Sequence, residues 1–235
     1  RGALGQDLLG GHALRGVGAP AAAPGDDDAN VSIEVITKEG TFAPADRDSL
    51  RVTAGTVQSL DLSKVIGGAH ATLKLTSDVP IVAGARQFFG SAKVQNETSF
   101  SAGRQPFSEV SGVSGLPTKG STTVHLGITA PTADAEVDVV LLPFTGGAAA
   151  ATPTPARRVK VTAGTVKWVQ LQAPVRSDWM SVVVTPAPGS GPVLLAHRVR
   201  EPSRYGDLVT GYPWNPLRIE VTVPTAQQDL AITLR

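Results

Sequence analysis

A twelve-residue stretch occurs twice in this chain, and this repetition constrains the fold more than any other feature of the sequence. The first copy, residues 51–62, reads Arg-Val-Thr-Ala-Gly-Thr-Val-Gln-Ser-Leu-Asp-Leu. The second, residues 160–171, lies 109 positions later and keeps seven of the twelve residues, including the whole Val-Thr-Ala-Gly-Thr-Val run. A repeat of this kind indicates internal duplication, so we expect two units of the same architecture.

The hydrophobic pattern around the repeat predicts an all-β fold. Val31, Ile33 and Val35 alternate with polar residues, as in a strand with one buried face. The Ala-Gly pair inside the repeat predicts a tight turn or a bulge between two strands. No helical pattern of about 10–15 residues separates the strands, which disfavours a parallel α/β fold. About seven strands in 80–100 residues is typical of an immunoglobulin-like or jelly-roll β-sandwich.

The unit boundaries follow from counting the strands. A short strand ended by proline and followed by a second strand occurs three times, whereas the Val-Thr-Ala-Gly-Thr-Val run occurs only twice. We therefore expect each unit to open at that run, because the chain then ends where a unit ends. An alternative phase starts the first unit at Val31 and leaves the last seven residues as an extra strand. The preferred division is a partial repeat at 1–43, a first sandwich at 44–146, a Gly/Ala linker at 147–153 and a second sandwich at 154–235.

The first unit carries an insertion relative to the second. Nineteen extra residues fall within 87–122, a segment with four phenylalanines among glycine and serine. We expect a long loop there, and loops often carry binding sites.

Composition excludes several classes of function. The net charge of +1 gives no electrostatic basis for binding nucleic acid. The absence of cysteine excludes disulfides, thiolate metal sites and cysteine nucleophiles. No apolar run reaches the roughly 18 residues of a membrane span. Because the chain begins at Arg1, we expect any signal or anchor to lie upstream of it.

No residue pattern predicts an enzyme, a cofactor or a metal site. The four histidines (His12, His70, His125 and His197) have no metal-ligand spacing. The segment 112–116 lacks the final glycine and the helix of a nucleophile elbow. We therefore expect a non-enzymatic protein.

The large aromatic residues are concentrated in the second unit. All three tryptophans and both tyrosines follow position 160. We expect Trp168 and Trp179 to fill the core, because they fall at strand positions. Tyr212 and Trp214 belong to a proline-flanked loop and, with Tyr205, are the candidate ligand-binding residues. Exposed aromatic rings could form a flat platform for sugar rings.

Two arginines occupy equivalent positions in the two units. Arg86 and Arg198 are 112 residues apart, as are Pro80 and Pro192. We expect a structural role for both arginines, either stacking on an aromatic ring or pairing across a sheet edge.

The Val-Thr-Ala-Gly-Thr-Val run, together with Leu-Lys-Leu-Thr-Ser-Asp-Val-Pro-Ile-Val-Ala at 73–83, resembles a family of actinobacterial exported proteins with no established activity. The resemblance covers roughly residues 30–235. It implies an extracellular or cell-envelope location and an envelope partner, for example a membrane glycosyltransferase. Two functions are consistent with the sequence. One is a non-enzymatic structural or adaptor protein that binds another envelope protein; the other is a carbohydrate-binding module that uses the aromatic residues of the second unit.

Overall fold

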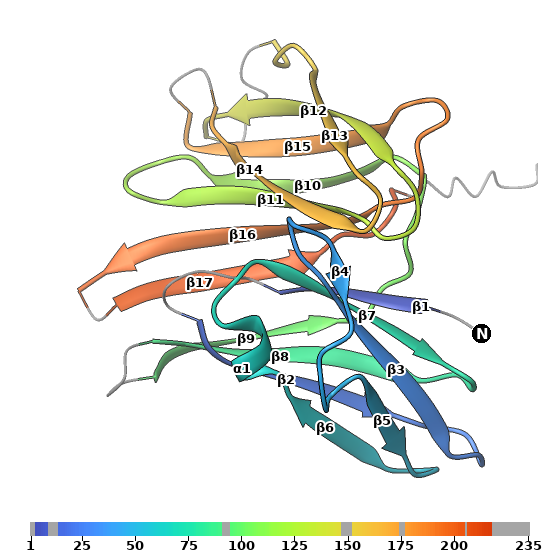
Figure 1. Cartoon of the computed structure of the whole chain (residues 1–235). Helices are drawn as coiled ribbons and strands as arrows, with labels where there is room; N and C mark the ends of the chain where they lie inside the picture. The colour runs from blue at the N-terminus through green and yellow to red at the C-terminus, as the bar shows by residue number, and fades with distance from the viewer. Residues whose placement is uncertain are drawn as a thin grey trace, which may run out of the picture.

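The computed structural model describes residues 3–8, 14–90, 95–146, 152–173, 177–204 and 206–217. This part of the chain is all β apart from one short helix, α1 (Ser63–Ile66). None of its helices has the length and apolar character that a membrane crossing requires. Figure 1 shows two β-sandwiches stacked on one another, each made of two antiparallel sheets.

The first sandwich, unit 1, contains the strands from β1 to β9. We name each sheet after one of its central strands. The β3 sheet has the order β1 (Ala3–Leu8), β7 (Ala71–Ser77), β3 (Ala29–Ile36) and β4 (Thr41–Phe42), with β5 (Ser49–Val52) also paired to β3. The β8 sheet has the order β6 (Val57–Asp61), β2 (Leu14–Ala22), β8 (Val82–Gly90) and β9 (Gln95–Ala102).

The second sandwich, unit 2, repeats this topology with the strands from β10 to β17. The β12 sheet has the order β10 (Ser111–Pro117), β15 (Trp179–Pro186), β12 (Ala135–Phe144) and β13 (Arg157–Val161). The β16 sheet has the order β14 (Thr165–Leu171), β11 (Thr123–Ala130), β16 (Leu194–Ser203) and β17 (Gly206–Pro213). The prediction of an all-β, sandwich-type fold is confirmed.

The strand pairing divides the chain at a different place from the one expected. Strands β2 and β3 pair with β6, β7 and β8, so residues 14–43 are part of unit 1 and not a separate partial repeat. Within the described residues, strands β10, β11 and β12 pair only with later strands, so unit 2 begins near Ser111, well before residue 154. A sequence repeat defines the period of a duplication but not its phase, because long-range strand pairing sets the boundary. The strands expected within 218–235 lie outside the described residues.

The expected long loop within 87–122 is largely strand. Its described residues contain the end of β8, the edge strand β9 and strand β10, which pairs with β15. Gly- and Ser-rich strands lack the apolar alternation by which a strand is recognised in a sequence. A proline can also lie within a strand here, since Pro20 is inside β2 and does not end it.

The repeated turn carries the chain from one sheet to the other in both units. It joins β5 to β6 in unit 1 and β13 to β14 in unit 2. Gly55 and Gly164 adopt positive φ angles of 69° and 71°, a conformation that favours glycine. Their N–H groups donate to the carbonyl oxygens of Ala23 and Ala130, at 2.8 and 2.7 Å. The positive φ angle therefore explains why glycine occupies this position in both copies of the repeat.

An aspartate secures the same turn in each unit. The N–H of Ala54 donates to Oδ1 of Asp28 at 2.9 Å, and the N–H of Ala163 donates to Oδ1 of Asp134 at 2.7 Å. The bond from Ala54 and the Arg51 guanidinium lower the pKa of Asp28. The repeated stretch therefore has a structural role, and the hydrogen bonds that hold its turn are equivalent in the two units.

The two units pack closely through the outer face of the β16 sheet, the face turned away from the core of unit 2. The hydroxyls of Thr72 and Thr129 form a buried hydrogen bond of 2.7 Å across the junction. The backbone N–H of Val166 donates to the carbonyl of Thr37 at 3.0 Å, and the Thr41 hydroxyl donates to the carbonyl of Gly164 at 2.8 Å. In Figure 1, β16 and β17 accordingly lie on the side of unit 2 that faces unit 1.

Candidate functional site

The three candidate ligand-binding residues do not form a common aromatic platform. Tyr212, on the edge strand β17, is 60% exposed. Trp214 is only 4% exposed, and its indole N–H donates to Nδ1 of His197 at 2.9 Å within the core of unit 2. Its backbone N–H continues the pairing with β16 through the carbonyl of Leu195, which carries the ring into the core. Tyr205 lies outside the described residues, so Tyr212 alone is shown facing solvent.

Tyr212 borders a groove between the two units. The groove has a volume of about 390 Å³ and runs between β9 and β17, the outermost strands of the β8 and β16 sheets. These two strands pack beside one another without backbone pairing in the described chain. The lining residues come from β9, β16 and β17: Glu97, Thr98, Ser99, Phe100, Val199, Glu201 and residues 208–212.

Exposed apolar side chains are concentrated in this groove. Phe100 is 66% exposed, Leu208 is 45% exposed and both line it beside Tyr212. Two carboxylates, Glu97 and Glu201, stand among them. Edge strands present unpaired backbone N–H and C=O groups, which can pair with an extended segment of another chain. The groove therefore combines sheet edges that can pair with another chain, exposed apolar side chains and negative charge.

A second and larger hollow opens at one end of unit 2, between the β12 and β16 sheets. Its volume is about 880 Å³. Gln170, Gln172 and the ion pair between Lys119 and Asp178, at 2.6 Å, make part of its wall polar. No aromatic side chain lines it among the residues that the structure describes, and residues 174–176, next to its lining residue Ala173, are outside the description. It is a partly polar hollow at one end of the sandwich.

Four side chains from distant parts of the sequence meet at the unit junction. The rings of His70 and Trp168 lie 4.9 Å apart, and the Arg198 guanidinium lies 5.9 Å from the Trp168 ring. Burial, followed by the positive charges of Arg198 and His125, lowers the pKa of His70 to about 4. Burial and Arg198 also lower the pKa of His125. Both imidazoles are therefore neutral at pH 7.

The side chains of the junction cluster are closely packed. The indole of Trp168 lies across Gly127, where an added Cβ would come within 2.7 Å of its ring. Among the described residues no three His, Cys, Asp or Glu side chains are placed to hold a metal ion. His70 and His125 are far apart in the sequence, so their proximity at the junction could not be predicted from it.

The expectations for the remaining aromatic and arginine residues have mixed outcomes. Trp179 is 44% exposed and Trp168 lies at the junction, so the prediction that both fill the core is wrong. The prediction for the paired arginines is confirmed: the Arg86 guanidinium lies 4.8 Å from the ring centre of Phe88, as Arg198 lies over Trp168. Cation–π stacking is the shared role of these two positions.

Comparison with known families gives one match. Residues 15–172 match a family of unknown function (DUF5719). The chain belongs to this family. The matched region spans all of unit 1 from β2 onward and continues into unit 2 as far as β14. Searches of the curated proteins and of the solved structures found no match.

Proposed function

We propose that the protein is a non-enzymatic structural or adaptor protein of the bacterial cell envelope, and that it binds another envelope protein through the groove between β9 and β17. The observation that carries the proposal is the concentration of Phe100, Leu208 and Tyr212 in a groove between two sheet edges. Soluble proteins rarely leave apolar side chains gathered in this way unless a partner covers them.

The chemistry of the groove defines the kind of segment it takes. An extended chain adds to a sheet edge through its backbone, and its alternate side chains enter the same groove. Apolar residues at those positions would contact Phe100 and Leu208, while Lys or Arg beside them would face Glu97 and Glu201. The proposed ligand is an extended segment with alternating apolar and basic residues.

The envelope location and the actinobacterial origin rest on the family resemblance. The same resemblance supports a membrane glycosyltransferase as the partner that supplies the segment. The absence of cysteine is compatible with export and does not require it.

Carbohydrate binding is the alternative. It is supported by one exposed ring, that of Tyr212, because the ring of Trp214 is committed to the core by its bond to His197. A single ring gives less stacking area than the platform that the sequence suggested. A protein segment uses more of the groove than a sugar would.

Peptide display with the whole chain as bait tests the proposal. We expect enrichment of extended peptides that alternate apolar residues with Lys or Arg, and at least about tenfold weaker binding of those peptides by Leu208→Asp. Gln172→Asp, in the polar hollow of unit 2, is the control and should bind as the wild type does. Failure to enrich such peptides, or equal binding by Leu208→Asp, would refute the groove. Binding on a glycan array that Tyr212→Ala abolishes would instead support the alternative.

A further inference from the structure

The outer face of the β16 sheet is apolar and is buried by unit 1. Unit 1 covers this face, and the apolar side chains there are buried: Val166 is 2% exposed, Leu194 4% and Ala196 2%. Each alternates along its strand with residues that point into the core of unit 2. The face is thus an interface within the chain.

Unit 1 has the equivalent face on the outside of its β8 sheet. Ala21 pairs with Ala83 as Ile128 pairs with Leu195, which sets the correspondence of the strands. With this correspondence, Val57 is structurally equivalent to Val166, and Val82 is structurally equivalent to Leu194.

These equivalent residues remain apolar although solvent reaches them. Val57 and Val82 are each 66% exposed. Ala22 lies between them, Pro20 and Gly84 follow in the next row of the same face, and Arg86 occupies the place of Arg198. The outer face of the β8 sheet is therefore apolar, as its buried counterpart in unit 2 is, but no part of the described chain packs against it.

The opposite end of the molecule carries the matching surface. Unit 1 turns Ile36 and Thr72, both 0% exposed, and His70 towards unit 2. The corresponding residues of unit 2 are Leu142, Ser181 and Trp179, on the outer face of the β12 sheet. Trp179, which corresponds to the stacked His70, is 44% exposed.

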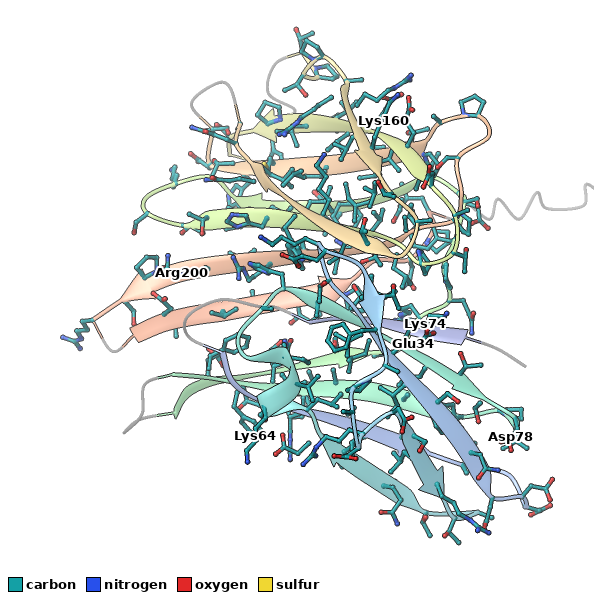
Figure 2. The ribbon with its side chains drawn as sticks, in the orientation of Figure 1. Glu34, Lys64, Lys74, Asp78, Lys160 and Arg200 are labelled. Atoms are coloured by element: carbon teal, nitrogen blue, oxygen red, sulfur yellow. The ribbon has the colours of Figure 1, made fainter. Side chains whose placement is uncertain are left out.

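Two further positions show that the β12 sheet is more apolar than its counterpart. On the outer face of the β3 sheet, Glu34 and Lys74 form an ion pair of 2.7 Å, and Figure 2 shows both side chains on that strand pair. The corresponding cross-strand pair in unit 2 is Val140 and Val183. An ion pair on the surface of unit 1 is thus replaced by two valines on the surface of unit 2.

We propose that a second copy of this chain docks the outer face of its β12 sheet, centred on Trp179, onto the outer face of the β8 sheet of the first copy, centred on Val57 and Val82. The contact repeats between copies the junction that joins unit 1 to unit 2 within one chain. Trp179 takes the place of His70 and lies near Ser59, Pro20 and Arg86, where the guanidinium can stack on the indole as Arg198 stacks on Trp168.

The contact is heterologous, because the two faces are different surfaces of the molecule. Each copy keeps one free face of each kind, so association continues head to tail and does not stop at a dimer. The junction between copies is weaker than the one within the chain. The Thr72–Thr129 hydrogen bond has no equivalent, since Ser181 and Ala22 stand at those positions, and tethering no longer raises the effective concentration.

Sedimentation velocity of the full chain at increasing concentration tests this arrangement. We expect the average mass to grow beyond that of a dimer as the concentration rises through about 10–1,000 µM. The double variant Val57→Glu, Val82→Glu lacks one face, and Trp179→Glu lacks the other, so each alone should remain monomeric. An equimolar mixture should form a dimer and stop there, because one intact face of each kind remains. The control Gln58→Glu adds the same charge on β6 but on the opposite side of the strand, and it should associate as the wild type does.

Cysteine cross-linking gives a second readout that does not depend on disrupting the faces. The chain contains no cysteine, so Ala22→Cys combined with Ser181→Cys introduces the only two thiols, at the positions that correspond to the bonded Thr129 and Thr72. Mild oxidation should give a ladder of disulfide-linked dimers, trimers and longer species, and the pair Gln58→Cys with Ser181→Cys should not. A wild type that stays monomeric at every concentration, or a mixture of the two face variants that fails to associate, would overturn the proposal. So would a Trp179→Glu variant that still dimerises, since that result indicates a symmetric contact through the β8 sheet.

Discussion

The two units share one topology but differ in what fills their cores. The core of unit 1 is rich in alanine: Ala19, Ala21, Ala23, Ala29, Ala71, Ala83 and Ala85 are all part of it. The core of unit 2 is built from larger side chains and includes Phe107, Met180 and Trp214. The same strand order therefore tolerates two side-chain volumes, because strand pairing and the repeated turn are common to both units while the packing between sheets is not.

Exchanging the side chains at one pair of equivalent core positions should change the free energy of unfolding more than any other substitution below. Leu126 and Ala19 occupy the same place in β11 and β2 and are 0% and 2% exposed. We expect Leu126→Ala to lower the free energy of unfolding by about 2–5 kcal/mol through the cavity it leaves. Ala19→Leu should cost about 1–3 kcal/mol by overpacking the smaller core. Urea denaturation measures both; a neutral Ala19→Leu would show that unit 1 has unfilled space.

The sequence predicts those parts of this comparison that depend on local pattern. Alternation at Val31, Ile33 and Val35 predicts β3, and the repeated Ala-Gly pair predicts a turn that the structure has in both units. Ser-rich β9 carries no such alternation of large apolar residues, so its strand character was missed. Strand β2 was expected to end at Pro20, and its pairing with β6 and β8, which sets the boundary between the units, was not predicted.

The candidate site was predicted only in part, for a related reason. Tyr212 is exposed as expected, but its neighbour Phe100 comes from a strand more than one hundred positions earlier in the chain. Whether a tryptophan is buried depends on what packs against it. Trp179 and Trp168 both fall at strand positions, yet one faces solvent and the other faces unit 1. Such long-range packing is not encoded in a local pattern.

The hydrogen bond between two threonine hydroxyls at the junction provides the next test, because it joins one unit to the other. Thr72 and Thr129 are both 0% exposed and bond across the junction. Thr72→Val should cost about 1–2 kcal/mol, because a buried hydroxyl of Thr129 loses one bond. The double variant Thr72→Val, Thr129→Val should cost less than the sum of the single changes, which a double-mutant cycle measures. Strict additivity would show that the bond contributes nothing to the junction.

Acid should weaken the junction through His70. The pKa of this imidazole is about 4 in the folded protein, below the ordinary value of 6.5, because of burial and then the nearby Arg198 and His125 charges. A depressed pKa means that the unfolded chain binds the proton first, so the stability due to the neutral ring is complete above about pH 6.5 and is lost as the pH falls towards 4. Partial exposure of the ring limits the loss to about 1 kcal/mol. Chemical denaturation at pH 7 and pH 4 should show a smaller difference for His70→Phe than for the wild type, and an equal difference would contradict this assignment.

The smallest expected difference compares the two copies of the repeated turn. Gly55→Ala and Gly164→Ala each place a Cβ at a positive φ angle, which costs about 1 kcal/mol. A Cβ at position 55 meets nothing within 4 Å, whereas one at position 164 would lie 3.1 Å from Oγ1 of Thr41, across the unit junction. Gly164→Ala should therefore be the more destabilising change, by a few tenths of a kcal/mol to about 1 kcal/mol. Adding Thr41→Ala, which removes the contacted oxygen, to both glycine variants should narrow the gap. If the two glycine variants melt at the same temperature, the junction yields to the extra methyl, and the identical turns are equivalent in energy as well as in geometry.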